Sequence, residues 1–331
     1  MGMRCLVIGD QSKCIAAEDS GVDADDIDSP LSDSKAPEAD ADGGSPDESP
    51  DLGAVTECVG DSDCKDPTKP ICRANQCRPC MTDSECPADP SVCMSHKDGH
   101  CATPAETIVV QNNASCAETA TGPDPIIGTT AMPVCSMEPL LQLIGADRRL
   151  VVVRGTVQAS SNALPTTPGG EVSIIGQQDA VIAGGASPGL QIQSAAMYVR
   201  AVAFKLSTLA GIRAVRSTLR LDEVLVDNNS GGGIFLDATQ FAIANSSITH
   251  NGPGLEGGTD VWGGVYVSNV LPTGPKLLQR VTIQANRGPG LICSGMITGT
   301  GVLATANSTL DVGPTCMLTS CPMPSPTCGA P

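Results

Sequence analysis

Five acidic residues in the second half of the chain carry the side chains best suited to catalysis. They are Asp222, Asp227, Asp237, Glu256 and Asp260. Two carboxyl groups held a few ångströms apart serve as general acid and as base or nucleophile in the cleavage of glycosidic bonds. Such a pair needs its members on neighbouring backbone segments that face the same side. Whether these acids meet therefore depends on the elements that position them.

A repeat of 22 residues determines where these acids lie. The apolar residues Ile182, Phe204, Val226 and Ile248 are spaced 22 apart, and the pattern resumes at Ile283 after one insertion. A period of about 20–25 residues kept over five units is typical of a solenoid. The sequence therefore predicts an all-β fold, a right-handed parallel β-helix wound from coils of about 22 residues.

Glycine follows these apolar anchors at a fixed distance. Gly189, Gly211 and Gly233 stand seven residues after the first three anchors, and Gly264 and Gly290 continue the series. Left-handed backbone angles cost glycine nothing, so we expect a sharp left-handed corner at each of them. Each glycine precedes a segment of period-two alternation, which predicts a strand with one buried face.

A polar column accompanies the apolar one. Ser207, Asn229, Asn251 and Asn286 stand three residues after the anchors. Amide side chains stacked at a turn can hydrogen-bond along the stack and satisfy the backbone groups of that turn. We interpret this column as structural rather than as a functional site.

Alignment of the coils tests the acidic candidates. One outward column places Asp227 beside Lys205, and another places Asp222 beside Arg200. Opposite charges on neighbouring coils predict exposed ion pairs, each worth at most about 1 kcal/mol. The aligned columns do not hold two acids on adjacent coils, so the sequence assigns no catalytic residue.

Aromatic side chains gather at one outward corner of the repeat. Arg213, Phe235 and Tyr266 form one column, Trp262 lies in the inserted loop, and His250 precedes that loop. Exposed rings beside hydrogen-bonding groups stack on sugars, and insertions into a solenoid commonly build its binding face. These five are the predicted ligand-binding residues. In the alternative interpretation, Phe235 and Tyr266 only cover the corner of the stack.

The repeat resembles the right-handed β-helix repeats of the pectin-lyase-like superfamily, over residues 107–308. Residues 139–145 resemble the family's short capping helix, and residues 150–155 and 172–176 its first strands. The resemblance implies a stacked-coil architecture. Polysaccharide lyases of this family use calcium held by acids, with Arg or Lys as base, and its hydrolases use clustered Asp residues. The likeness here is to architecture rather than to a catalytic motif.

The chain has 16 cysteines, eight of them between Cys58 and Cys101. Two units of about 22 residues recur there, beginning at Glu57-Cys58 and at Pro79-Cys80. They resemble the small Cys-rich repeats that precede larger domains in bacterial surface proteins. Such density predicts disulfides formed in an oxidising compartment, although spacing leaves the pairing open.

The alternative for this module is a zinc site, with Cys77 and Cys80 as a CxxC pair and His96 and His100 nearby. Disulfides are favoured, because a zinc module normally has two CxxC pairs at regular spacing, whereas this chain has only one. Cys293 is expected to face inward, either unpaired or tied to the C-terminal tail. The residues expected in disulfides are Cys58, Cys64, Cys72, Cys77, Cys80, Cys86, Cys93, Cys101, Cys116, Cys135, Cys316, Cys321 and Cys328.

The N-terminal segment carries most of the net charge of −17. Residues 18–57 hold 14 acids against Lys35 alone, which predicts a solvated tether and argues against nucleic-acid binding. No stretch approaches the roughly 18 apolar residues of a membrane-spanning helix. The first residues do not read as a signal peptide, so an exported chain is expected to start upstream or to be processed.

These observations predict a secreted or cell-surface protein. We expect a non-catalytic binding or adhesion module for a polysaccharide or cell-envelope component, with no metal or cofactor. The alternatives are a polysaccharide lyase or glycoside hydrolase and a purely structural envelope component. The expected parts are a tether (1–57), a disulfide module (58–101), an N-terminal cap (102–170), the coils (171–310) and a C-terminal cap (311–331).

Overall fold

The computed structural model describes residues 3–8, 11–16, 57–118, 127–164, 170–254, 262–271, 273–308 and 310–320. The chain divides into two units, residues 1–56 and 57–331. In the first unit, β1 (Met3–Ile8) pairs antiparallel with β2 (Gln11–Ala16). The acidic segment predicted as a tether lies almost wholly outside the described residues.

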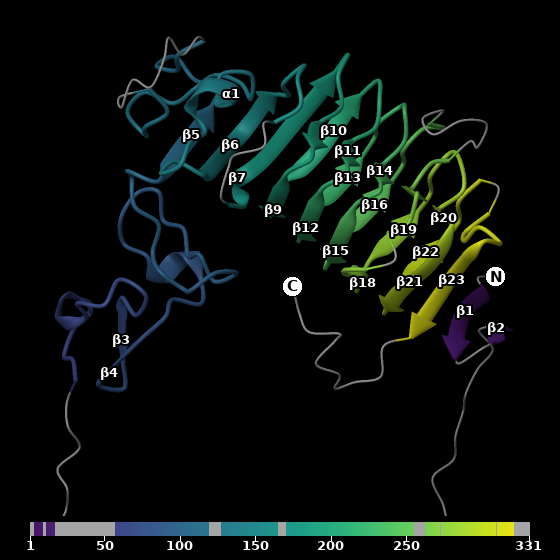
Figure 1. Ribbon diagram of the computed structural model, residues 1–331, viewed down its shortest axis with the longest axis horizontal. Coiled ribbons are helices and arrows are strands. Elements are labelled where there is room, and N and C mark those ends of the chain that lie inside the picture. Colours follow the sequence, from purple (N-terminus) through teal and green to yellow (C-terminus); the bar gives the residue numbers. More distant parts are fainter. Residues whose placement is uncertain are drawn as a thin grey trace, which may run out of the picture. The chain divides into compact units, whose positions relative to one another are not determined.

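The second unit contains a parallel β-solenoid, as the 22-residue repeat predicted (Figure 1). One face is a five-stranded sheet of β8 (Leu190–Gln193), β11 (Ile212–Val215), β14 (Ile234–Asp237), β17 (Val265–Ser268) and β20 (Leu291–Cys293). The remaining faces form one 14-stranded sheet. Its strands are β5 (Thr107–Gln111), β6 (Leu150–Gln158), β7 (Val172–Gly185), β9 (Ala196–Arg200), β10 (Ala203–Ser207), β12 (Thr218–Asp222), β13 (Leu225–Asp227), β15 (Gln240–Ala244), β16 (Ser247–Thr249), β18 (Lys276–Gln279), β19 (Thr282–Gln284), β21 (Gly295–Thr300), β22 (Leu303–Thr305) and β23 (Cys316–Ser320).

The predicted anchors stack in register through the core. Phe204 lies opposite Ile182 on one side and Val226 on the other. Val226 lies opposite Ile248, which in turn lies opposite Ile283 across the insertion. All five side chains are fully buried. The core is therefore a set of aliphatic columns that run along the solenoid axis, and the coil length is confirmed.

The corner glycines are required for a reason other than the predicted one. None of the glycines at 189, 211, 233, 264 and 290 has a positive φ. A Cβ at Gly189 would instead lie 2.6 Å from the carbonyl oxygen of Gly211, and one at Gly233 would lie 2.6 Å from Ile248 Cγ2. The left-handed explanation was wrong: glycine is needed because successive coils approach too closely for a side chain.

The left-handed corners are occupied by residues that carry side chains. Ala201, Glu223, Asn245 and Arg280 form one such column, with φ between 48° and 57°. Their side chains point away from the core and are half-buried or exposed. The coil therefore turns at a left-handed position that four different residue types occupy.

The predicted asparagine column is confirmed as a hydrogen-bonded ladder. Asn229 Nδ2 donates to Asn251 Oδ1 at 2.9 Å, and Asn251 Nδ2 donates to Asn286 Oδ1 at 3.1 Å. Asn286 donates in the same way to Asn307, which donates to Asp311. Each amide nitrogen also reaches a backbone carbonyl of the preceding coil, such as that of Val226. The ladder satisfies polar groups that burial would otherwise leave unpaired.

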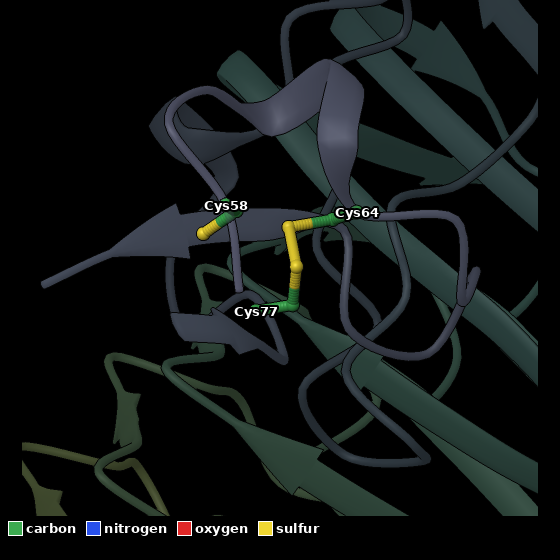
Figure 2. Close-up of side chains that lie close together, drawn as sticks. All are labelled: Cys58, Cys64 and Cys77. Atoms are coloured by element: carbon green, nitrogen blue, oxygen red, sulfur yellow. A yellow bond between two sulfur atoms is a disulfide. The ribbon is translucent and has the colours of Figure 1, made fainter. Parts of the chain in front are cut away.

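The cysteine module forms four disulfides, two in each repeat. Within a repeat the first cysteine pairs with the third and the second with the fourth. The pairs are Cys58–Cys72, Cys64–Cys77, Cys80–Cys93 and Cys86–Cys101. Three sulfur atoms of the first repeat lie within 4.8 Å of one another (Figure 2). Since these sulfurs are bonded to sulfur, they are not the thiolates that zinc requires.

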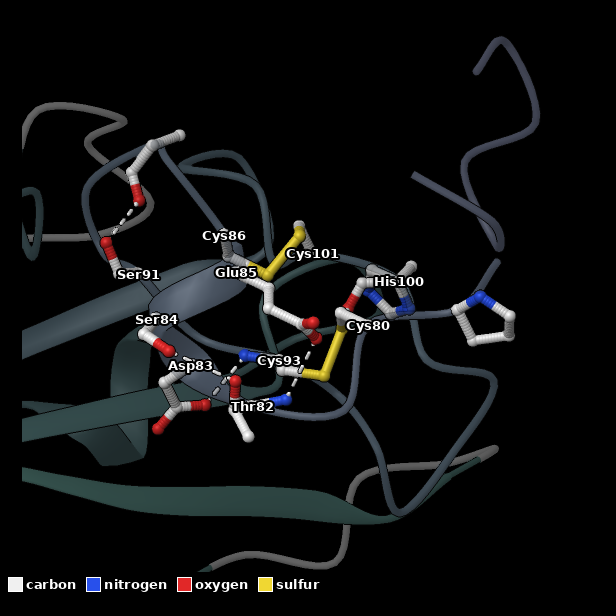
Figure 3. Close-up of a disulfide and its surroundings, with 12 residues drawn as sticks. Cys80, Thr82, Asp83, Ser84, Glu85, Cys86, Ser91, Cys93, His100 and Cys101 are labelled. Carbon is white, nitrogen blue, oxygen red and sulfur yellow. Dashed lines mark hydrogen bonds between the residues drawn. A yellow bond between two sulfur atoms is a disulfide. The ribbon is translucent and has the colours of Figure 1, made fainter. Parts of the chain in front are cut away.

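Both repeats are built on the same short turn. η1 (Asp61–Asp63) and η2 (Asp83–Glu85) each follow the first cysteine of their repeat, and the first repeat adds the hairpin of β3 (Ile71–Arg73) and β4 (Gln76–Arg78). The aspartate that opens each turn accepts a hydrogen bond from the backbone N–H of the third cysteine, as Asp83 does from Cys93 (Figure 3). The two units therefore repeat in structure as well as in sequence.

Disulfides also hold the two ends of the solenoid. Cys116 pairs with Cys135 beside the N-terminal cap, which contains α1 (Leu140–Leu143), as predicted. Cys293, whose state was open, pairs with Cys316. Cys321 and Cys328 lie outside the described residues.

Close stacking of the corner glycines yields a stability prediction. We expect Gly233→Ala to lower the free energy of unfolding by about 2 kcal/mol, because the added methyl group meets Ile248 and the Gly264 carbonyl oxygen. Gly145→Ala is the control, since a Cβ there meets nothing within 4 Å. Urea unfolding followed by circular dichroism measures both. Equal stability of the two variants would contradict the close-approach explanation.

Candidate binding site

The described acidic candidates lie at strand ends, and each accepts a hydrogen bond from a different side chain of the neighbouring coil. Asn245 Nδ2 donates to Asp222 Oδ1 at 2.7 Å, and Asn269 Nδ2 donates to Asp237 Oδ1 at 2.6 Å. Asp227 accepts a hydrogen bond from the Thr249 hydroxyl at 3.1 Å. The structure shows no hydrogen-bonding group shared between any two of these three acids. Glu256 and Asp260 lie outside the described residues.

Of the two predicted ion pairs, one is present. Lys205 Nζ lies 3.4 Å from Asp227 Oδ2, and His250 Nδ1 lies 3.0 Å from Asp227 Oδ1. Partial burial would raise the pKa of Asp227, but the hydrogen bonds from His250 and Thr249 and the nearby Lys205 charge hold it below its ordinary value. These contacts join neighbouring coils through the Asp227 carboxylate.

The predicted Arg200–Asp222 ion pair is wrong. The two residues share a register position, yet Arg200 Nη2 lies 2.6 and 2.7 Å from the carboxylate oxygens of Asp83. Asp83 belongs to the second cysteine repeat, which covers this face of the solenoid. The Arg200 guanidinium contacts both carboxylate oxygens of Asp83, which is a favourable geometry for a charge-assisted hydrogen bond. Its partner therefore comes from outside the solenoid repeat.

The predicted aromatic column exists, but its rings are not exposed. Phe235 lies between Arg213 and Tyr266 in register, and the Arg213 guanidinium carbon is 5.6 Å from the Phe235 ring centre. Phe235 and Tyr266 are only 5% and 8% exposed, and Trp262 is fully buried. The indole of Trp262 packs against the backbone at Gly232 and beside both other rings. The rings lie outside the solenoid core, but the expectation that they are exposed was wrong, because they are buried together with Trp262.

Arg213 beside Phe235 and Ile292 beside Tyr266 are half-buried. His250 has 64% of its side chain exposed and contacts Asp227, away from the described contacts of the rings. Trp262 Nε1 is buried and has no hydrogen-bond partner among the described residues. Sugar stacking on these rings would require Trp262 to move. The arrangement agrees with the alternative interpretation, in which Phe235 and Tyr266 cover the corner of the stack.

The sequence did not indicate a surface groove of about 570 Å³, which lies where strands β8, β11 and β14 of the five-stranded sheet end. It follows a left-handed corner column of Ser194, Arg216 and Ala238. Its lining residues are Ser194, Ala195, Ala196, Arg216, Ser217, Thr218, Ala238, Gln240 and Leu271. Leu271 comes from the longer connection between β17 and β18. The 22-residue spacing of Ser194, Arg216 and Ala238 was the available signal, but the role of this column at a corner becomes visible only in three dimensions.

The chemistry of the groove is that of a polar ligand site without an acid. None of the lining residues is acidic, although the chain carries a net charge of −17. Arg216 is exposed and offers a planar set of donors, and Gln240 and Thr218 add an amide and a hydroxyl. Ala195, Ala196 and Leu271 provide apolar contact. Such a groove can bind a neutral or negatively charged polar molecule.

A second cluster of titratable residues lies where the second cysteine repeat packs on the solenoid. His96 Nε2 lies 3.0 Å from Ser173 Oγ, and its ring stacks on Tyr198 at 3.8 Å. Arg220 lies 3.9 Å from Glu171 and 5.5 Å from the Tyr198 ring centre. The His96 side chain is 2% exposed, so it is closed to a substrate. This cluster holds the interface and is not a candidate active site.

Apolar packing and ion pairs complete this interface. Arg154 pairs with Asp89, and Gln177 Nε2 donates to the Ser91 carbonyl oxygen at 2.8 Å. The buried apolar side chains come from both partners: Val92 and Met94 from the module, Ala102 directly after it, and Leu150, Val152, Ile175 and Tyr198 from the solenoid. The second repeat is therefore a fixed part of the solenoid surface.

Burial gives this interface a predicted pH dependence. Desolvation first, and then the neighbouring cations, lower the pKa of His96 from 6.5 to about 3. Between these values the unfolded chain binds a proton at His96 that the folded chain does not, so stability falls as the pH drops through this window. Burial raises the pKa of Glu171, which acts in the opposite direction.

We expect the native chain to lose about 2 kcal/mol more stability between pH 7 and pH 4 than His96→Phe, which keeps the stack on Tyr198 but does not titrate. Met132→Phe is the control, because it introduces the same ring at an exposed position and removes no titrating group. Urea unfolding at both pH values measures the difference. An unchanged pH dependence in His96→Phe would refute the assignment.

None of the helices in the described part of the chain is long and apolar enough to cross a membrane. Comparison with protein-family models, with curated proteins and with solved structures finds no match to this chain.

Proposed function

We propose that this chain is a non-catalytic binding protein of the cell surface or extracellular space, and that it binds a saccharide in the groove at Arg216. The observation that carries the proposal is the groove itself. It has a volume of about 570 Å³, and its lining combines a guanidinium, an amide, hydroxyls and apolar side chains. Saccharides present hydroxyl groups together with apolar ring faces, which match this lining.

The disulfides support an extracellular location. Six are present among the described residues, and both repeats of the cysteine module depend on them. Disulfides of this density form and persist in oxidising compartments. Domains as small as one cysteine repeat have little apolar core and take their stability from such bonds.

The placement of the acids supports binding without turnover. Asp222, Asp227 and Asp237 each accept hydrogen bonds from a side chain of the next coil. A glycosidase or lyase needs acids that face one substrate from a common groove. The groove at Arg216 has no acid in its lining.

The architecture also supports a relationship to the pectin-lyase-like superfamily, as the sequence resemblance implied. The supporting features are the parallel coils of 22 residues, the asparagine ladder and the short α1 at the N-terminal end. In this proposal the chain keeps the scaffold of that superfamily and carries a binding groove in place of a catalytic one.

The single cation of the groove should select the ligand. Arg216 favours saccharides that carry a carboxylate or sulfate group, because a guanidinium binds such groups through paired hydrogen bonds. We expect Arg216→Met to weaken binding about tenfold or more, which corresponds to about 1.4 kcal/mol or more. Arg287→Met is the control, since Arg287 is exposed on another part of the surface and is not among the lining residues.

A glycan array first identifies the ligand, and calorimetry then compares the two variants with the native chain. The same glycans are incubated with the protein and examined for cleavage products. Binding that is lost in Arg216→Met without any cleavage supports the proposal. Cleavage would favour the polysaccharide lyase or hydrolase alternative, and absence of binding to any glycan would favour a purely structural role.

A further inference from the structure

The two ends of the solenoid core are finished differently. At the N-terminal end, Met137, Leu140, Leu143 and Ile144 from the cap are buried against the core. At the C-terminal end, the last apolar side chains remain only half-buried. These are Val302, Ala304, Val312, Cys316 and Leu318, which we call the terminal face. They pack on the core from one side, and no further coil of the described chain covers the other.

Two strands border the terminal face with free edges. β22 and β23 are the last strands at the two ends of the 14-stranded sheet. Among the described residues, nothing pairs with their outer edges. Leu303, Leu310 and Met317 flank the terminal face, with exposures of 46%, 49% and 58%. An open strand edge beside exposed apolar side chains is a template for pairing with another chain.

The charge distribution removes the usual protection against such pairing. From residue 288 to residue 331 the sequence contains one charged side chain, Asp311, although the whole chain has 19 basic and 36 acidic residues. Asp311 accepts hydrogen bonds from Asn307, so it is occupied within its own coil. Natural sheet edges commonly carry lysine or other charges that oppose association. Here Asp311 is the only charged side chain of the segment, so two identical copies bring a single carboxylate each to this surface.

We propose that the terminal face binds the terminal face of a second copy, which gives a two-fold, end-to-end dimer. A head-to-tail contact would require the N-terminal end to be open, but the cap covers it. The contact therefore closes after two copies instead of continuing into a fibre. Two copies related by a two-fold axis bring their edge strands together antiparallel, which is a favourable arrangement for edge pairing.

The test uses the full chain with its disulfides intact. Light scattering across a dilution series is expected to show a dimer that dissociates on dilution, and small-angle X-ray scattering an elongated particle. We expect Leu303→Lys to raise the dissociation constant at least tenfold, which corresponds to about 1.4 kcal/mol, because it places a charge on an exposed side chain that flanks the terminal face. Leu225→Lys is the matched control: it makes the same substitution at the same register position of β13, which is paired on both sides.

A second measurement needs no variant. Hydrogen exchange of the native chain at low and high concentration is expected to show added protection at β22 and β23 when the dimer forms. The proposal is overturned if the chain is monomeric at every concentration. It is also overturned if Leu225→Lys dissociates the dimer as strongly as Leu303→Lys, or if concentration changes exchange only at other strands.

Discussion

The spacing between coils is the constraint on which the rest of this structure depends. Parallel strands lie about 4.8 Å apart, so every residue must fit against its counterpart one coil away. Glycine is required at 189, 211 and 233 because the next coil occupies the space of a Cβ. Isoleucine, valine and phenylalanine alternate freely in the anchor column, because their side chains point into the core and stack on one another. The same spacing lets each asparagine reach the next.

The binding and packing surfaces lie at positions where side chains point outward and are not limited by the spacing between coils. The left-handed corners direct side chains outward, and the groove at Arg216 follows one such corner. The insertion before β17 brings Trp262 over the aromatic corner and closes it. The second cysteine repeat closes another face through Arg200 and His96. Each surface property of the solenoid is set by a residue or segment that the repeat itself does not dictate.

This division explains how far the sequence could predict the structure. Phe204 and Val226 revealed the coil, and Asn229 and Asn251 revealed the ladder, because periodic residues report on their neighbours one period away. The partner of Arg200 could not be predicted, since Asp83 lies 117 residues earlier in the chain. The burial of Phe235 was missed for a similar reason, because Trp262 lies in the insertion and has no counterpart in other coils. The groove was missed because it is made by backbone corners rather than by a motif.

The amide-to-amide hydrogen bonds of the asparagine ladder all run in the same direction along the chain, and they end at Asp311. Along the ladder, each side-chain amide donates one N–H group to the amide oxygen of the next coil, and its own oxygen accepts from the coil before. The aligned amides form a dipole whose positive end lies at the last coil, much as in an α-helix but with the sign of the ends reversed along the chain. Asp311 places a carboxylate at that end, where it accepts the last two N–H groups and has no hydrogen to pass on. A negative charge therefore acts as the terminator of the column, and its position in the sequence sets how many coils the ladder joins.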